Sequence, residues 1–135
     1  MKASEYRAMA MASWTESEFL DELIAQALVR GWHVYHPRPA RSDRGWRTAG
    51  QGTPVGFPDL TLCRDGVVIF AELKSEKGRL SDDQRAWLEA CGGQVWRPSD
   101  WDQIMAQLAH SGESSGCTTD VRLGQGDASR FEGSR

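Results

Sequence analysis

Residues 56–74 read GFPDLTLCRDGVVIFAELK, two short apolar segments on either side of an Asp-Gly pair. Asp-Gly readily supplies the positive φ angles of a two-residue type I′ turn, so the stretch predicts a β-hairpin with Asp65-Gly66 as its turn. Counting outward from this turn places Asp59 directly opposite Glu72. The hairpin is therefore expected to bring two carboxylates together at the end far from the turn.

The opposed carboxylates need an explanation, because directly facing Cβ atoms lie only about 4.5–5.5 Å apart and like charges there repel. A bound divalent cation would remove the repulsion. Lys74 follows Glu72 by two residues, so both side chains lie on one face of the strand, about 6.6 Å apart along it. The alternative is a surface salt bridge of Lys74 with the two acids, worth about 0–1 kcal/mol. Fixed acids and one lysine at a strand end suit hydrolytic chemistry, which favours the cation.

The composition indicates one ordinary globular domain. The chain has 135 residues and a formal net charge of −3, which excludes a wholly basic nucleic-acid binder but not a local basic patch. No apolar run approaches the roughly 18 residues that cross a bilayer, and the N-terminus lacks the apolar core of a secretory signal. Three scattered cysteines without a C-x-x-C pair fit a reducing cytoplasm better than a disulfide framework. We therefore expect a cytoplasmic protein with no membrane association.

A helix is predicted from Thr15 to Gly31. Thr15 and Glu18 have the spacing of a capping box, apolar residues then recur with helical period, and the glycine ends the run. Glu16 lies four residues before Leu20 and shares its inward stripe. This carboxylate is either a favourable charge in the first helical turn or a group with a buried partner, and both interpretations stay open.

The connection over residues 37–55 is rich in arginine. Its Gly and Pro content predicts irregular structure, and a connection of this length is usually functional or disordered. Arginines interleaved with Trp46 could contact phosphates and stack on bases, whereas a solvated surface loop is the alternative. In the strand predicted just before it, over residues 32–36, His33 and His36 lie on opposite faces, which favours structural roles over shared metal ligation.

The second half of the chain continues the alternation of helices and strands. Ser81 and Gln84 form another capping box, and the helix that they begin ends at a Gly-Gly pair. Gln84 leans toward the core side, for which capping alone is a sufficient reason. Residues 94–97 predict a fourth strand, and Ser99 is expected to cap a final helix. Gly, Ser, Thr and Asp dominate residues 111–135, which predicts a disordered tail.

The ordered motifs resemble the VRR-NUC domain of the PD-(D/E)xK nuclease superfamily, in particular its small stand-alone versions in phages and bacteria. The motifs are Thr15-Glu16, Gly56-x-Pro58-Asp59, Glu72-x-Lys74 and Ser81-x-x-Gln84. The E-x-K motif alone is not specific, but the ordered set with the hairpin spacing is. We predict a VRR-NUC-like domain over residues 15–110, preceded by an N-terminal extension over residues 1–14. The expected fold is α/β with a restriction-endonuclease-like core, a mixed sheet of about four strands with a central antiparallel hairpin, flanked by helices.

The resemblance also implies a role for each matched residue. The residues that it assigns to catalysis are Glu16, Asp59, Glu72, Lys74 and Gln84. Asp59 and Glu72 would bind Mg²⁺ or Mn²⁺ with the backbone carbonyl of Leu73 and with Glu16, and Lys74 would orient or deprotonate the attacking water. Carboxylate oxygens suit Mg²⁺, which keeps waters that can act as the nucleophile. The residues expected to contact nucleic acid are Arg38, Arg41, Arg44, Arg47 and Lys77.

The sequence therefore predicts a metal-dependent DNA endonuclease. The resemblance further implies selectivity for branched or junction DNA and, in many members, a homodimer. Two other classes remain open. One is a non-catalytic nucleic-acid-binding module with the nuclease fold, against which the intact set of Asp59, Glu72 and Lys74 argues. The other is a phage or mobile-element interaction protein whose hairpin edge pairs with a partner.

Overall fold

The computed structural model describes residues 2–38, 40–42, 45–47 and 50–110, and in 40–42 and 45–47 the backbone only. The predicted tail over residues 111–135 lies outside this part of the chain. The elements in chain order are α1 (Ala3–Ala12), α2 (Glu16–Val29), β1 (His33–Tyr35), β2 (Ala40–Ser42), β3 (Gly45–Arg47), β4 (Leu60–Arg64), β5 (Val67–Leu73), α3 (Asp82–Cys91), β6 (Gln94–Trp96), the 3₁₀ turn η1 (Pro98–Asp100) and α4 (Trp101–Ala109).

The main sheet has four strands in the order β1-β4-β5-β6. The pairs β1–β4 and β4–β5 are antiparallel, and β5–β6 is parallel, with α3 as the crossover that a parallel pair requires. The predicted turn is confirmed, since Asp65 and Gly66 have φ values of 50° and 79°. The register is confirmed as well: Leu60 pairs with Ala71, so the next pair outward is Asp59 and Glu72.

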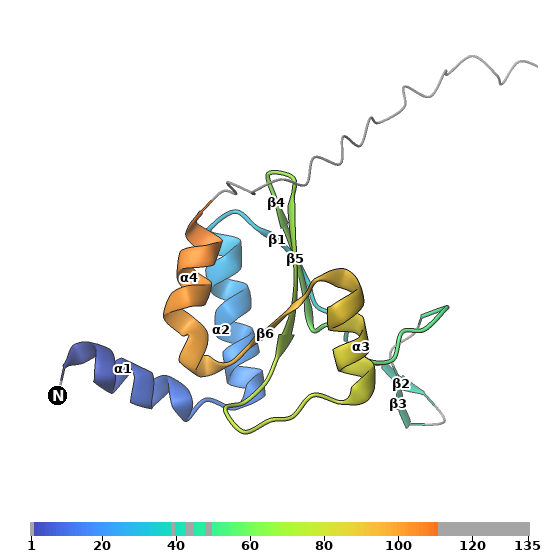
Figure 1. Ribbon diagram of the computed structural model, residues 1–135, viewed down its shortest axis with the longest axis horizontal. Coiled ribbons are helices and arrows are strands. Elements are labelled where there is room, and N and C mark those ends of the chain that lie inside the picture. Colours follow the sequence, from blue (N-terminus) through green and yellow to red (C-terminus); the bar gives the residue numbers. More distant parts are fainter. Residues whose placement is uncertain (1, 39, 43–44, 48–49, 111–135) are drawn as a thin grey trace, which may run out of the picture.

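Helices cover both faces of this sheet. Figure 1 shows α2 and α4 on one face and α3 on the other. Alternate residues of β4 and β5 face α2 and α4 and are buried there, as period-2 strand geometry requires. The main core consists of Phe19, Leu23, Ala27, Trp32, Leu60, Leu62, Ile69, Ala71, Leu73, Trp96, Ile104 and Leu108. On the α3 side, the rings of Phe57, Phe70 and Trp87 meet edge to face.

The connection over residues 37–55 contains a second, two-stranded sheet, so the prediction of irregular structure was wrong there. β2 and β3 pair antiparallel, with Arg41 opposite Trp46 and Ser42 opposite Gly45. Pro37 and Pro54 lie outside the two short strands, and Gly45 is the first residue of β3, so neither residue type interrupts the pairing. In Figure 1 this hairpin lies beyond α3, away from the sheet.

Both predicted capping boxes are present, but the final helix begins differently from the prediction. Thr15 and Glu18 cap α2, and Ser81 and Gln84 cap α3. Ser99, the predicted cap of the last helix, lies inside η1, and Asp100 is the residue that precedes α4. The N–H of Ser99 instead donates to the Glu76 side chain at 2.6 Å, so a tertiary contact sets this helix start.

Helix α1 occupies most of the predicted N-terminal extension. None of its residues is buried, and it contacts η1. Within the described ranges, no helix combines the length and apolar character that a bilayer crossing requires.

Candidate active site

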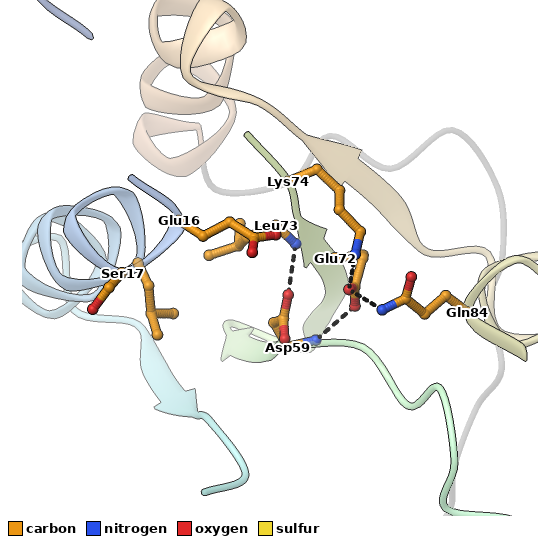
Figure 2. A pocket seen from close by; sticks show the side chains of 8 residues that line it. Glu16, Ser17, Asp59, Glu72, Leu73, Lys74 and Gln84 are labelled. Carbon is orange, nitrogen blue, oxygen red and sulfur yellow. Dashed lines mark hydrogen bonds and ion pairs between the residues drawn. The ribbon is translucent and has the colours of Figure 1, made fainter. Parts of the chain in front are cut away.

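The hairpin holds its two carboxylates with main-chain hydrogen bonds that cross between the strands. The N–H of Asp59 donates to Glu72 Oε2 at 3.2 Å, and the N–H of Leu73 donates to Asp59 Oδ2 at 2.9 Å (Figure 2). Each carboxylate therefore accepts a hydrogen bond from a backbone N–H of the opposite strand. The backbone fixes both carboxylates in place in spite of their mutual repulsion.

Glu72 is in an unusual environment for a carboxylate. Its exposure is 2%, and among the described residues it is the only charged or polar one classed as buried. Burial, together with the charge of Asp59, raises the pKa of Glu72 to about 7, although the Lys74 ammonium acts in the opposite direction. A buried acid with a strongly shifted pKa in a cavity is typical of a functional site.

Lys74 lies beside Glu72, with its Nζ 3.5 Å from Glu72 Oε1. The side chains are 13% and 2% exposed, so this pair is not the solvated surface salt bridge of the alternative interpretation. Charges that are shielded from water interact more strongly than exposed ones. Lys74 therefore compensates part of the acidic charge inside the site.

Gln84 connects this site to α3 through both ends of its side-chain amide. Its Oε1 accepts from the N–H of Ser81 at 2.9 Å, which is half of the capping box. Its Nε2 donates to Glu72 Oε1 at 2.8 Å (Figure 2). Capping is thus one of two functions of this residue, because the other end of the amide binds the buried acid.

Gly56 lets the hairpin segment approach the start of α3. Its φ is +86°, and a Cβ there would lie 2.5 Å from the carbonyl carbon of Asp83 and 2.7 Å from the nitrogen of Gln84. Any side chain at this position would push the first turn of α3 away. The indole of Trp87 adds a hydrogen bond of 3.0 Å to the carbonyl of Thr53, on the same approaching segment.

The residues predicted for catalysis and metal binding line one cavity of about 310 Å³. Its lining consists of Glu16, Ser17, Leu20, Asp59, Glu72, Leu73, Lys74 and Gln84. Glu16 reaches it from the first turn of α2, on the side of the site opposite Gln84 (Figure 2). Glu16 is exposed, so it lies at the rim of the core and not inside it, although it shares the inward stripe of α2.

The donor set fits a hard divalent cation. In the described part of the chain, no three His, Cys, Asp or Glu side chains gather into a metal-binding group, so Asp59 and Glu72 form a pair. Mg²⁺ is often bound by one or two carboxylates and keeps several waters, for which an open cavity beside the pair provides room. Metal ligation by Asp59 and Glu72, by Glu16 and by the Leu73 carbonyl stays a prediction.

The residues predicted to contact nucleic acid are spread over two segments. Lys77 is exposed in the loop that follows β5, three residues beyond Lys74, and Arg38 is exposed after β1. Arg41 and Arg47 belong to β2 and β3, whose backbone alone is described, and Arg44 lies outside the described residues.

Two residues beside the site were not predicted from the sequence. His36 Nδ1 lies 2.7 Å from the carbonyl oxygen of Asp59, so a residue interpreted as structural supports the loop that holds an acid. Arg97 binds the loop after Lys74. In the sequence, 23 and 22 residues separate these partners, and no local pattern connects them.

A mixed sheet with helices on both faces and two acids and a lysine at a strand end defines a restriction-endonuclease-like nuclease fold. The sequence matches the family model of the VRR-NUC domain over residues 3–111, which includes α1. The chain belongs to the VRR-NUC family, within the PD-(D/E)xK nuclease superfamily, and the family implies a nuclease-type function. Comparison with curated proteins and with solved structures finds no significant match.

Proposed function

We propose that this protein is a divalent-metal-dependent endonuclease that hydrolyses phosphodiester bonds in DNA. The observation that best supports this is the buried carboxylate of Glu72, placed against Asp59, Lys74 and Gln84 at one cavity. Burying a carboxylate beside another acid is costly for folding, so a gain outside folding is needed to account for it.

Each residue of the cavity has a separate role in the proposed hydrolysis. Asp59 and Glu72 would hold Mg²⁺ or Mn²⁺, which when bound supplies charge neutralisation and a more acidic water. Lys74 would keep its proton at Nζ and donate a hydrogen bond to the attacking water or to the phosphate. In this way it would stabilise the developing negative charge. Gln84 fixes the orientation of Glu72 by donating to Oε1. Glu16 would accept a hydrogen bond from a water across the cavity.

Phosphoryl transfer requires mainly positioning and electrostatic stabilisation from the protein. The crossed main-chain bonds between Asp59, Glu72 and Leu73 meet the first requirement, because they fix two oxygens before substrate arrives. The low exposure of Lys74 and Glu72 meets the second, since their charges act where water screens them little.

The test is cleavage of branched and linear DNA by purified protein in Mg²⁺, Mn²⁺, Ca²⁺ or EDTA. We expect cutting in Mg²⁺ or Mn²⁺ only, faster on branched substrates, and a loss of at least about a hundredfold in Glu72→Ala and Lys74→Ala. Arg64→Gln is the matched control, since Arg64 contacts the carbonyl of Arg30 far from the cavity.

Two results would contradict the proposal: cutting that persists in EDTA, or full activity in Glu72→Ala. DNA retention without cleavage in Mn²⁺ would instead favour a non-catalytic binding module. The homodimer implied by the family is part of the proposal, and light scattering of the purified protein measures it directly.

A further inference from the structure

The loop over residues 75–78 turns back over the stem of the site lysine. The N–H of Gly78 donates to the carbonyl of Ser75 at 3.1 Å, which closes the turn. A Cβ on Gly78 would lie 3.2 Å from Ser75 Oγ, 3.3 Å from Lys74 Cδ and 3.4 Å from Lys74 Cβ, so Gly78 lies next to the aliphatic part of the lysine side chain. This cover explains why Lys74 has an exposure of only 13% although it follows the end of β5.

Arg97, the residue after β6, holds this loop from outside the site. Its Nη1 donates to the carbonyl oxygens of Ser75 at 2.6 Å and Gly78 at 2.8 Å, with that of Glu76 at 3.4 Å. Hydrogen bonds from a charged donor are about twice as strong as neutral ones. The planar guanidinium, which stays protonated, is therefore bonded to both ends of the turn that covers Lys74.

One further bond ties the loop to the neighbouring segment over residues 96–99, and another ties Lys74, just before the loop, to the same segment. Glu76 Oε1 accepts from the N–H of Ser99 at 2.6 Å, and the N–H of Lys74 donates to the carbonyl of Trp96 at 3.0 Å. Residues 96–99 thus contact Lys74 and three residues of the loop that follows it, Ser75, Glu76 and Gly78. Arg97 is the one side chain of that segment that reaches into the turn in these contacts.

We propose that Arg97 is a positioning residue that sets the conformation of Lys74 by closing the loop over residues 75–78. Arg97 does not line the cavity, so it acts on the reaction through the loop and not by contact with substrate. The effect on catalysis rests on the proposed nuclease function, whereas the effect on the loop does not.

The loop itself is tested by limited proteolysis with trypsin. Lys77 is exposed inside the loop, and cleavage after it requires the turn to open. We expect Arg97→Gln to raise the rate of cleavage after Lys77 by about tenfold or more, measured by mass spectrometry. Arg64→Gln is the matched control, because Arg64 Nη1 also donates to a backbone carbonyl, that of Arg30 at 2.8 Å, in another region. Equal rates in Arg97→Gln and wild type would overturn the proposal.

The link to Lys74 is tested by DNA cleavage kinetics. We expect Arg97→Gln to lower kcat by about tenfold with KM unchanged, and Arg97→Lys to recover part of it because it keeps the charge but not the planar fork. In a Lys74→Ala background, Arg97→Gln should have no further effect on kcat. The same loss of kcat in both backgrounds would show that Arg97 does not act through Lys74.

Two further outcomes are informative. If wild type cuts no DNA while the loop of Arg97→Gln opens, the proposed function fails and the anchoring by Arg97 stands. If circular dichroism shows that Arg97→Gln is unfolded, Gly78→Ala replaces it, since the added methyl would lie 3.2 Å from Ser75 Oγ and 3.3 Å from Lys74 Cδ while the Arg97 side chain is retained. Gly78→Ala should then lower kcat in the same way, and unchanged kcat would contradict the proposal.

Discussion

A single side-chain amide links helix capping to the buried acid. Gln84 Oε1 binds the N–H of Ser81, and this bond directs Nε2 toward Glu72. An amide has a donor end and an acceptor end, so only one orientation satisfies both partners. The capping box consequently determines which atom of Gln84 faces the site.

Gln84→Glu separates the two functions. Glutamate is a standard capping-box residue, so α3 should keep its start, and circular dichroism should show the same helix content. The new carboxylate would face Glu72 without a proton donor, and we expect cleavage to fall by at least about tenfold. Glu18→Gln is the control, because Glu18 occupies the same capping position in α2 and is exposed. Full cleavage activity in Gln84→Glu would contradict this role.

At the level of single residues, the sequence predicts contacts whose partners are close in the chain. The opposition of Asp59 and Glu72 follows from the turn alone, and the Ser81–Gln84 pair from helix geometry. The sequence does not reveal that Gln84 also bonds to Glu72, or that Glu72 is almost fully buried. Both depend on how closely α3 packs on the sheet, which local patterns do not encode.

At the level of elements, the contact between Gly56 and α3 decides where Gln84 lies. Gly56→Ala would add a methyl group 2.5 Å from the Asp83 backbone in a residue with positive φ. We expect a loss of roughly 2–4 kcal/mol in the free energy of unfolding and a fall in DNA cleavage beyond what stability explains. Urea denaturation and cleavage rates measure the two effects.

Gly52→Ala is a close control for this substitution. Gly52 also has a positive φ, +83°, but a Cβ there would meet nothing within 4 Å. The difference between the two variants therefore isolates the contact with α3 from backbone strain. Equal losses in both would show that the close approach has no effect.

The elements that local patterns define were predicted well, and those set by tertiary contacts were not. The hairpin and the two capped helices each have turn or cap residues within a few positions. The predicted start of α4 was wrong because the side chain of Glu76 accepts a hydrogen bond from the N–H of Ser99, and that of Asp100 accepts one from the N–H of Arg97. The β2–β3 pair was missed because three-residue strands have too few residues to show a period.

For the whole molecule, Glu72 makes stability depend on pH. Its pKa rises from 4.5 to about 7 on folding, so the folded state binds the proton more tightly. This contribution to stability is complete below about pH 4.5 and is lost as the pH rises through about 7. Hydrogen bonds with Thr15 lower the pKa of Glu18. Its contribution to stability is therefore lost only as the pH falls below about 4.5, outside the range in which Glu72 titrates.

We expect the free energy of unfolding, in EDTA, to decrease between pH 5 and pH 8. The limiting slope for one proton is about 1.4 kcal/mol per pH unit. Urea denaturation at four pH values measures it, and Glu72→Gln, which cannot titrate, should flatten the curve. A flat curve for wild type would contradict the raised pKa of Glu72 in the folded state.

Metal should reverse this loss of stability. Protons and cations compete for Glu72, so Mn²⁺ or Mg²⁺ should raise the melting temperature more at pH 8 than at pH 6. At a metal concentration of 100 times Kd the gain is about 2.7 kcal/mol. Thermal scans with and without metal measure it, with Asp59→Ala as the variant that should not respond. An equal response of Asp59→Ala would place the metal elsewhere.

The short span of the hairpin also has a kinetic consequence. Asp59 and Glu72 are 13 residues apart, and the turn between them closes by local pairing, so little chain entropy is lost when they meet. The pair of carboxylates can then form before α2 and α3 dock, in the transition state for folding, and bind the cation there. Divalent metal is thus expected to accelerate refolding as well as to slow unfolding. Stopped-flow chevron plots at several Mn²⁺ concentrations would measure how much each rate constant changes.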